Sequence, residues 1–559
     1  MSAVEILDNR EPVLEPAKRR GLALVPRGDS APAQFATSRS DSSDTKVPLK
    51  TWLAVFGSAL GAFMAILDIQ IVNASLPEIQ GAIGAGIDDG AWISTSYLVA
   101  EIVVIPLTAW LSQAFSVRRY MIVNAALFVA FSLACAFATT LPQMIVLRAL
   151  QGFTGGVLIP LAFTVVVTSL PKSKQPIGMA LFGLSVTFAP AIGPTIGGYL
   201  TENYGWEYIF YINLLPGTAM IALLWLSLAK VPMRLRLLRE GDWLGILTMA
   251  IGLGALQTAL EEGNKDDWFG SPFIVRLSVI AAIALPLFVC VELWKKKPLL
   301  NLRLLMRRNF GLGTTANFLL GMALYGSVFI LPLYLSQMQG YNAEQIGEVM
   351  MWYGLPQLLI IPLVPKLMQR IDARLMLGFG AAMFAASAFL NINLSSDYSG
   401  PQFIWPNIVR AFGQAILLAP LAGIATAGIE VENVGSASAL FNMMRNLGGA
   451  IGIAGLQTFL TKREQYHSNV ITSQVSLFAE ASRARIDKLT QYFLNHGIAD
   501  TAQAKHEAIV TIGRAVHRQA YFLGYGDTFL LLGIALAIAA LAIAFMKKPE
   551  QTLGGAGAH

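Results

Sequence analysis

Charged residues are scarce in this chain of 559 residues. Asp, Glu, Lys and Arg together make up 13% of it, whereas soluble domains carry about 25%. Hydrophobic residues make up 55% and recur in runs such as TFLLLGIALAIAALAIAFM. Such runs are long enough to cross a bilayer, which takes about 20 mostly apolar residues. The composition therefore excludes a soluble protein and predicts an all-α integral membrane protein.

Other absences narrow the function. The chain has only two cysteines, Cys135 and Cys290, and both lie in apolar runs, so we expect no disulfide. All five histidines lie after residue 461, which leaves none for the membrane interior. No HExxH motif, CxxC pair, P-loop or Ser/His cluster occurs. We therefore expect no enzyme, cofactor, metal site or ATP-driven pump. The net charge of +6 does not indicate a nucleic acid partner, because in a membrane protein the placement of Lys and Arg matters more than their sum.

Fourteen membrane-spanning helices are predicted from the apolar runs. We place them at residues 52–76, 91–111, 119–140, 143–169, 177–200, 207–229, 243–261, 272–294, 309–336, 343–369, 374–394, 402–428, 436–461 and 521–546. Residues 1–50 are polar and of mixed charge, which is typical of a disordered cytoplasmic tail rather than a signal peptide. A second cytoplasmic tail is predicted at 547–559.

Positive charges alternate between the loops that connect these helices. Loops predicted to be cytoplasmic hold clusters of Lys and Arg, as at residues 118–119 and 295–297, whereas the short external loops hold only Lys265. By the positive-inside rule, this pattern places both termini in the cytoplasm. The loop GIEVENVG is an exception, because it is predicted to be cytoplasmic yet contains no Lys or Arg.

One connection, at residues 462–520, is polar and much longer than the others. Its stretch VSLFAEASRARIDKLTQYFL has apolar residues at broadly helical spacing. We predict one or two amphipathic helices here, on the external side of the membrane.

The stretch FMAILDIQIVNASLP, residues 63–77, places Asp68 inside an apolar run. An acid at the centre of a spanning helix costs roughly 2.5–3.5 kcal/mol, so such an acid normally faces a partner or a polar cavity. Two interpretations are open: Asp68 is a structural acid fixed by a neighbouring helix, or it exchanges protons during transport. Since no histidine is available, carboxylates are the only plausible proton carriers.

Two further charges lie within predicted spans. Glu101 follows Tyr97 by four residues on one helix face, and it is either a coupling acid or an acid that snorkels to the surface. Arg148 stays protonated and must be paired or hydrated, with Asp68 and Glu101 as the alternative partners. Protonation of the paired acid would free Arg148, and such a switch would bias which side of the protein is open.

Several stretches carry a family pattern. The first span contains L-D-x-x-x-x-N-x-x-x-P, the fourth contains R-x-x-Q-G within VLRALQGFTGGVLIP, and the fifth contains LSVTFAPAIGPTIGGYL. Together with WEYIFYINLLPG and RNLGGAIG, they resemble the fourteen-helix drug:proton antiporters of the EmrB/QacA type in the major facilitator superfamily. The residues of the conformational motif are Gln151, Gly152, Pro190, Gly193, Pro194, Gly197 and Gly198.

The fifth span has a mechanical interpretation. Gly193 and Gly197 share a helix face and permit close backbone approach, while Pro190 and Pro194 remove hydrogen bonds and bend the helix. This helix is predicted to act as a pivot or a seal, and ordinary packing of small residues is the alternative.

The chain departs from the family pattern at two places. In AWLSQAFSVRRYM, Ala109, Gln113 and Ser116 stand where the superfamily usually has Gly, Asp and Gly, so we do not expect the acid-based cytoplasmic latch. Glu101 stands where the family generally has a neutral residue. One interpretation is that this acid is specific to the substrate or ion of this chain.

The resemblance implies a fold of two six-helix bundles, at residues 51–230 and 309–546, with two inserted helices and linkers at 231–308. It also implies proton-coupled efflux of hydrophobic or amphipathic toxic compounds by alternating access. The charges within the predicted spans make Asp68, Glu101 and Arg148 the candidates for proton coupling. Soft apolar walls and amides suit such substrates. The predicted substrate residues are Phe63, Met64, Asn317, Tyr325, Asn442, Met443 and Arg445.

A location and partners are implied as well. The resemblance places the chain in a bacterial inner membrane, where its external helices would meet a periplasmic membrane-fusion adaptor and an outer-membrane channel. The alternatives are an exporter of a specific metabolite, such as a fatty acid or siderophore, and a non-transporting membrane receptor. The complete motifs of the first, fourth and fifth spans argue against the receptor.

Overall fold

The computed structural model describes residues 47–295, 298–475 and 479–544, and nearly all of them are helical. Most of the tail predicted at 1–50, and all of the tail predicted at 547–559, lie outside the described residues. Within these ranges, twelve helices are long and apolar enough to cross a membrane. The chain is thus an all-α, multi-pass membrane protein, as its composition predicts.

A first group of helices covers residues 49–227. Its bounds are α1 (Leu49–Ala74), α2 (Leu76–Ala82), α3 (Ile87–Gly90), α4 (Trp92–Phe115), α5 (Val117–Cys135), α6 (Leu141–Gly155), α7 (Leu158–Ser169), α8 (Gln175–Tyr204), α9 (Tyr208–Tyr211) and α10 (Leu214–Ser227). The predicted span 143–169 is divided into α6 and α7 where Gly155 and Gly156 follow one another, since glycine weakens a helix interior.

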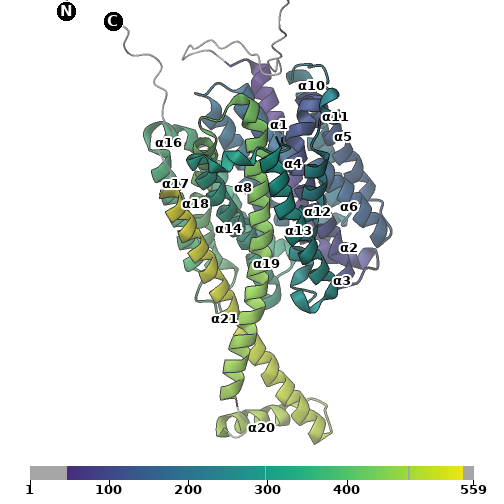
Figure 1. The fold of residues 1–559 in the computed structure, drawn as a ribbon. Helices are drawn as coiled ribbons and strands as arrows, with labels where there is room; N and C mark the ends of the chain where they lie inside the picture. Colours follow the sequence, from purple (N-terminus) through teal and green to yellow (C-terminus); the bar gives the residue numbers. More distant parts are fainter. Residues whose placement is uncertain (1–46, 296–297, 476–478, 545–559) are drawn as a thin grey trace, which may run out of the picture. The chain divides into compact units, whose positions relative to one another are not determined.

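Two inserted spans follow, with short helices beside them. Their bounds are α11 (Arg236–Arg239), α12 (Trp243–Gly263), η1 (Trp268–Gly270), α13 (Pro272–Trp294) and η2 (Leu302–Met306). The side chain of Asp242 caps α12 by accepting a hydrogen bond from Gly245 N at 2.8 Å. α12 packs on α4 and α19, whereas α13 packs mainly on α12 and leaves most of its surface free for lipid (Figure 1).

A second group of helices completes the bundle. Its bounds are α14 (Arg308–Gln339), α15 (Ala343–Ile360), η3 (Ile361–Leu363), α16 (Val364–Arg370), α17 (Ala373–Phe389), α18 (Gly400–Thr426), η4 (Val431–Asn433), α19 (Val434–Gln474), α20 (Glu480–Asn495) and α21 (Thr501–Ala544). α17 is apolar but shorter than the twelve candidate spans, and α19 is not among them. The count of fourteen crossings therefore stays a prediction.

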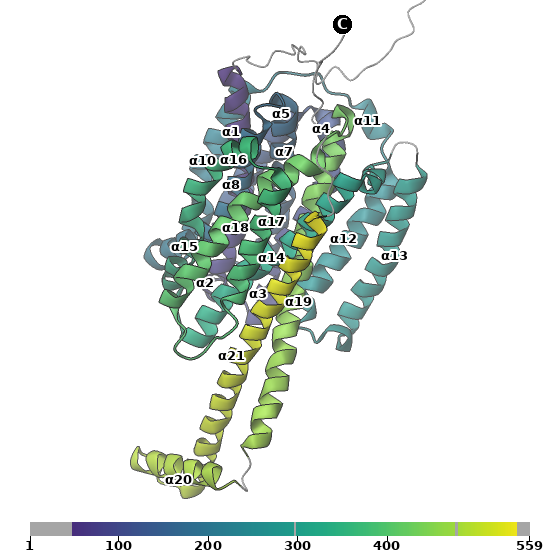
Figure 2. The same cartoon turned by 90° about the vertical axis from the view of Figure 1, so that its left-hand side faces the viewer.

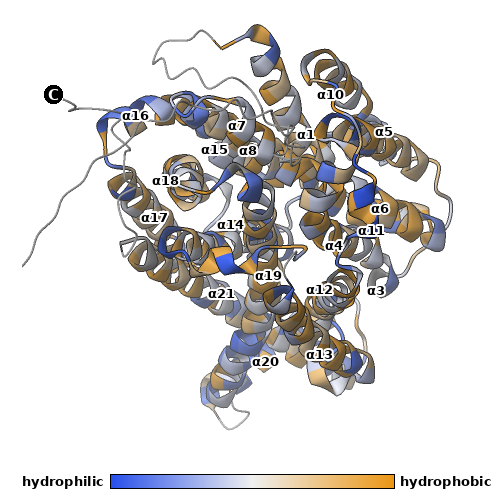
Figure 3. Cartoon of the chain, turned by 45° about the horizontal axis from the view of Figure 1, so that its top comes forward, coloured by the Kyte–Doolittle hydropathy of each residue, from blue (hydrophilic) through white to orange (hydrophobic). Residues whose placement is uncertain are grey.

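α19 and α21 extend beyond the predicted spans 436–461 and 521–546. Figures 1 and 2 show the two helices running side by side past the other helices, with α20 at their far end. Arg463 and His467 on α19 both contact Asp527 on α21, at 2.6 and 2.7 Å. Much of the predicted loop 462–520 therefore continues the flanking helices, and α20 is markedly more hydrophilic than the bundle (Figure 3).

The two groups meet where α4 packs on α19 and α8 packs on α15. Glycines permit this approach: a Cβ at Gly347 would lie 2.5 Å from Thr195 Cα. Thr195 Oγ1 instead donates a hydrogen bond to Gly347 O at 2.9 Å. On the α7–α19 contact, Ser438 Oγ donates to Pro160 O at 2.8 Å. Of the buried charged residues, Asp68 and Arg148 lie within the first group, and Glu101 lies at the α4–α19 contact between the groups.

Candidate functional site

Asp68 lies at the centre of a buried hydrogen-bond network in the first group of helices. Its Oδ2 accepts from Arg148 Nη1 at 2.6 Å, and its Oδ1 accepts from Gln151 Nε2 at 2.9 Å and from Asn213 Nδ2 at 2.7 Å. The Asp68 and Arg148 side chains are 0% and 1% exposed. Three donors, one of them charged, therefore hold the carboxylate away from solvent.

The fourth-span motif explains why this pair forms. Arg148 and Gln151 are one helical turn apart on α6 and point the same way, and Arg148 Nη1 also donates to Gln151 Oε1 at 2.8 Å. Gly152 follows, and a Cβ there would lie 2.3 Å from Tyr97 O, so glycine is needed for α6 to approach α4. The Tyr97 ring then covers the Arg148 guanidinium at 4.3 Å, a cation–π contact.

The sequence leaves two partners open for Arg148, and the structure selects Asp68. The sequence interpretation missed Asn213, although this residue lies in WEYIFYINLLPG, one of the stretches that carry the family resemblance. Asn213 Nδ2 also donates to Ser132 Oγ at 3.0 Å, and Ser132 Oγ donates to Phe210 O at 2.9 Å. The network therefore joins α1, α5, α6 and the α9–α10 connection around one acid.

Glu101 belongs to a separate network, at the contact between the two groups. Its Oε1 accepts from Asn446 Nδ2 on α19 at 3.0 Å, and Tyr325 on α14 donates to Asn446 Oδ1 at 3.5 Å. Arg445 directly precedes Asn446 on α19 and places a positive charge beside this network. Because Glu101 is 3% exposed, the alternative of an acid that snorkels to the surface is wrong. Asn446 was also missed, although it lies in the quoted stretch RNLGGAIG.

Arg445 is fully buried, and its three guanidinium nitrogens have no partner at hydrogen-bond geometry among the described residues. Native proteins pair most buried polar groups, so the Arg445 guanidinium keeps an unusual unused capacity to donate hydrogen bonds. Several unpaired buried atoms lie on α14, α15, α18 and α19. They belong to Thr314, Asn317, Gln357, Arg410, Gln414, Asn442 and Arg445.

Four of the predicted substrate residues belong to the Glu101–Asn446 network or carry unpaired buried atoms. Tyr325 donates to Asn446, the hydrogen-bond partner of Glu101, and Arg445 is the residue before Asn446. Asn317 and Asn442 lie on α14 and α19, which pack along each other. The Asn317 amide donates to Phe441 O at 2.7 Å, and the Asn442 amide donates to Ser438 O at 2.9 Å. Each asparagine thus keeps an unpaired buried oxygen.

The other three predicted substrate residues lie in apolar surroundings. Phe63 on α1 stacks on Phe188 of α8, with 6.2 Å between ring centroids. Met64 is fully buried in a cluster with Tyr97 in the first group. Met443 packs in a different cluster formed by α4, α12 and the second group. The structure therefore does not bring all seven residues to one place.

The predicted close approach of the fifth span is present in α8, which runs as one helix through Pro190 and Pro194. A Cβ at Gly193 would lie 2.4 Å from Gln70 Cβ of α1, and one at Gly197 would lie 2.9 Å from Ile71 O. Gly198 faces the opposite way: its Cβ would lie 2.7 Å from the carbonyl carbon of Ala343 on α15. The glycines thus let α8 contact both groups, and its action as a pivot stays a prediction.

The AWLSQAFSVRRYM motif has Ser116 where the superfamily usually has glycine, yet the backbone conformation at this position is one that glycine adopts easily. Ser116, between α4 and α5, has φ 73° and ψ 135°, a conformation that favours glycine. At the same end of α4, a Cβ on Gly435 of α19 would lie 3.3 Å from Ala109 Cβ and 3.9 Å from Gln113 Nε2. The departing residues therefore lie where α4 meets the start of α19.

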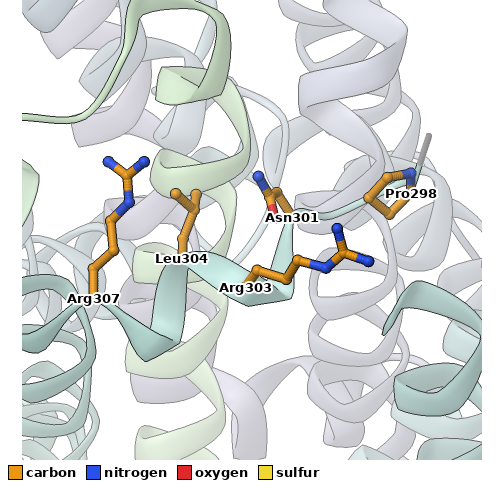
Figure 4. Close-up of a pocket in the computed structure, with 5 residues that line it drawn as sticks. All are labelled: Pro298, Asn301, Arg303, Leu304 and Arg307. Atoms are coloured by element: carbon orange, nitrogen blue, oxygen red, sulfur yellow. The ribbon is translucent and has the colours of Figure 1, made fainter. Parts of the chain in front are cut away.

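The GIEVENVG loop, which contains no Lys or Arg, is linked to a cation from elsewhere in the chain. Arg307 Nη2 donates to both Glu430 carboxylate oxygens, at 2.7 and 2.9 Å. This arginine lowers the pKa of Glu430 to about 2. Arg303 and Arg307 both line a cavity of about 160 Å³, with Leu304 between them (Figure 4). Arg303 Nη2 donates to Leu293 O at 2.9 Å. None of the residues that line this cavity takes part in the hydrogen bonds around Asp68 or Glu101.

Comparison with known proteins identifies the family and the fold. The family model described as Major Facilitator Superfamily matches residues 58–453. Among solved structures, the proton:xylose symporter XylE is similar with a TM-score of 0.56 and 14% identity, covering 89% of this chain and 96% of that protein. The human organic anion transporter MFSD10 is similar with a TM-score of 0.53 and 15% identity, covering 88% of this chain and 100% of that protein. These two likenesses concern the fold alone.

Sequence relatives cover nearly the whole chain. The colistin resistance protein EmrB of Acinetobacter baumannii is 33% identical, over 91% of this chain and 99% of that protein. The multidrug export protein EmrB of Escherichia coli and the fatty acid resistance protein FarB of Neisseria gonorrhoeae are each 30% identical, over 89% of this chain and 96% of each relative.

Proposed function

The chain belongs to the major facilitator superfamily, and from this premise we propose that it exports hydrophobic or amphipathic toxic compounds in exchange for protons. The export function is supported by relatives named as multidrug export proteins. In this proposal the two six-helix groups rock about a substrate held between them, as in alternating access. The fold class predicted from the family motifs is confirmed by the family match and the structural neighbours.

The observation that carries the proposal is the buried Asp68–Arg148 ion pair. Inside a membrane protein, a paired intramembrane acid is by default a functional group. Uptake of a proton by Asp68 removes the charge that Arg148 binds at 2.6 Å, while Arg148 remains charged. The network of α1, α5, α6 and α10 must then rearrange, which gives the proton a means to bias the conformation of this group.

Glu101 provides a second acid, placed to act on the contact between the groups. Its hydrogen bond with Asn446 joins residues 345 positions apart, on α4 and α19. In the proposal, a change in the charge of Glu101 alters its interaction with Arg445 and so the α4–α19 contact. Asp68 and Glu101 thus act on different elements of one cycle.

Location and partners follow from the same premise. We place the chain in a bacterial inner membrane with both termini cytoplasmic, since the Lys and Arg clusters favour this orientation. The hydrophilic α20 and the extended α19 and α21 would then project outward. They offer a surface for a periplasmic membrane-fusion adaptor, which with an outer-membrane channel would carry substrate out of the cell.

Export of one metabolite class, such as a fatty acid, is the second candidate. It is favoured by the relative FarB, which is named for fatty acid resistance, and by the unpaired buried arginine Arg445. A non-transporting receptor has no such support.

The proposed function is tested in proteoliposomes that hold the purified protein and an imposed pH gradient. A fluorescent amphipathic cation and a lipophilic weak acid are offered separately. Accumulation that depends on the gradient, and that a protonophore abolishes, is the expected result. Movement that is the same with and without the gradient would refute proton coupling, and no movement of any compound would favour the receptor.

A further inference from the structure

Arg410 on α18 is the counterpart of Arg148 on α6. The two halves of this fold are parallel repeats, and α6 and α18 each supply the fourth span of their group. The sequences correspond as well, with RALQG at 148–152 and RAFGQ at 410–414. Both arginines are followed by a glutamine on the same helix face, Gln151 at three residues and Gln414 at four.

The two arginines also share their surroundings. Arg148 is covered by the ring of Tyr97 from the second span of its group, at 4.3 Å. Arg410 is covered by the ring of Tyr353 from the second span of the other group, at 4.0 Å. Both arginines are buried, with 1% and 4% of their surfaces exposed. In each half, therefore, a tyrosine ring from the second span covers the guanidinium of an arginine from the fourth span.

The difference lies in what the guanidinium binds. In the first group, Arg148 and Gln151 both bind the Asp68 carboxylate. In the second group, Nε and Nη2 of Arg410 and both amide atoms of Gln414 have no partner among the described residues. Arginine and glutamine thus bind a carboxylate in the first group, whereas their counterparts in the second group have no carboxylate to bind.

The nearby helices offer no acid to complete the second site. α14, the counterpart of α1, contains no Asp or Glu, and neither do α17 and α18. The acids of α15 are Glu344 and Glu348, and both are exposed. A buried arginine without a counter-ion is strongly unfavourable unless a charge is supplied. A carboxylate on a bound molecule would supply that charge.

We propose that Arg410 and Gln414 form a carboxylate-binding site for amphipathic acids, an assignment that rests on the proposed export function because it defines the substrate class. The guanidinium binds the carboxylate through its edge, as Arg148 binds Asp68, while the Tyr353 ring covers its face. Phe384, whose ring centroid lies 5.8 Å from Arg410, adds an apolar wall. A ligand with an acidic head and an apolar body fits this chemistry.

The test measures binding directly, to purified protein in nanodiscs. The probes are dodecanoate, with dodecanol and dodecyltrimethylammonium as neutral and cationic controls of equal chain length. Arg410→Gln should weaken dodecanoate binding about ten- to hundredfold, the range of lost hydrogen bonds to a charged group, and leave both controls unchanged. Arg276→Gln, which removes an exposed arginine on α13, should bind all three like the unmodified protein.

A reciprocal variant keeps the test independent of folding. Gln414→Glu places a carboxylate one helical turn from Arg410 on α18. This carboxylate would serve Arg410 as an internal counter-ion, the role that Asp68 of α1 has for Arg148. It should raise the unfolding temperature and abolish dodecanoate binding. Equal dodecanoate affinity in Arg410→Gln and the unmodified protein would overturn the proposal, as would binding of chloride but not dodecanoate at Arg410.

Failure of this site is distinguishable from failure of the export function. If Arg410→Gln still exports an amphipathic cation but binds dodecanoate normally, the carboxylate site is wrong and export stands. If the unmodified protein binds dodecanoate through Arg410 but transports nothing, the site stands and the export function is wrong.

Discussion

Replacement of Asp68 by asparagine should both destabilise the protein and uncouple it from protons. The substitution leaves Arg148 buried without its counter-ion and sets an amide donor against the donors that now bind the carboxylate. Removing one partner of a buried ion pair costs roughly 3–5 kcal/mol. With both side chains 0–1% exposed, solvent cannot reduce that cost. We therefore expect the free energy of unfolding to fall by about this amount.

The assay follows unfolding through a thiol-reactive dye at Cys135, which is buried 3.7 Å from Gln151, in a Cys290→Ser background. The double variant Asp68→Asn/Arg148→Gln removes both charges and should recover most of the stability, but no proton-coupled transport. An Asp68→Asn protein as stable as its parent, with the same transport rate and pH dependence, would refute the reasoning. Glu101 would then be the leading proton carrier.

Three further substitutions give distinct expected results. Gly152→Ala places a Cβ 2.3 Å from Tyr97 O and should destabilise the α4–α6 contact by about 1–3 kcal/mol, measured by thermal unfolding; an unchanged midpoint contradicts this. Ser116→Gly relieves a positive φ and should stabilise the protein by about 1 kcal/mol, whereas a lower midpoint would show that the serine is needed. Glu430, with its pKa lowered from 4.5 to about 2 by Arg307, stabilises the folded state above pH 4.5 and loses this effect as pH falls toward 2. Glu430→Gln should therefore leave the shape of the transport pH profile between pH 5.5 and 8 unchanged, and a shifted profile contradicts the assignment.

The sequence was sufficient to predict the membrane class, the approximate positions of the helices and the need of Arg148 for a buried partner. Hydropathy predicts each spanning helix from its own residues alone, and a charge in an apolar run can be recognised without knowing how the helices pack. The R-x-x-Q-G spacing even places Arg148 and Gln151 on one face. Which acid Arg148 binds was beyond this reasoning, because that choice depends on how α1, α4 and α6 pack.

Contacts between distant helices were the least predictable part. Asn446 approaches Glu101 only because α4 and α19 pack together across 345 residues, and helical periodicity carries no information on such a contact. Met64 was predicted at the substrate site from its type alone, yet it packs in a core cluster with Tyr97. The lengths of α19 and α21 were underestimated because polar residues end an apolar run without ending a helix.

The measurement that tests the central claim most directly is the number of protons moved per substrate molecule. Proteoliposomes with a pH-sensitive dye in the lumen and a transported fluorescent substrate report both fluxes together. For the unmodified protein, we predict proton movement that starts with substrate addition and runs opposite to substrate, and for Asp68→Asn/Arg148→Gln we predict no substrate-dependent proton movement. Equal proton-to-substrate ratios in the two proteins would contradict the assignment of coupling to the Asp68–Arg148 pair.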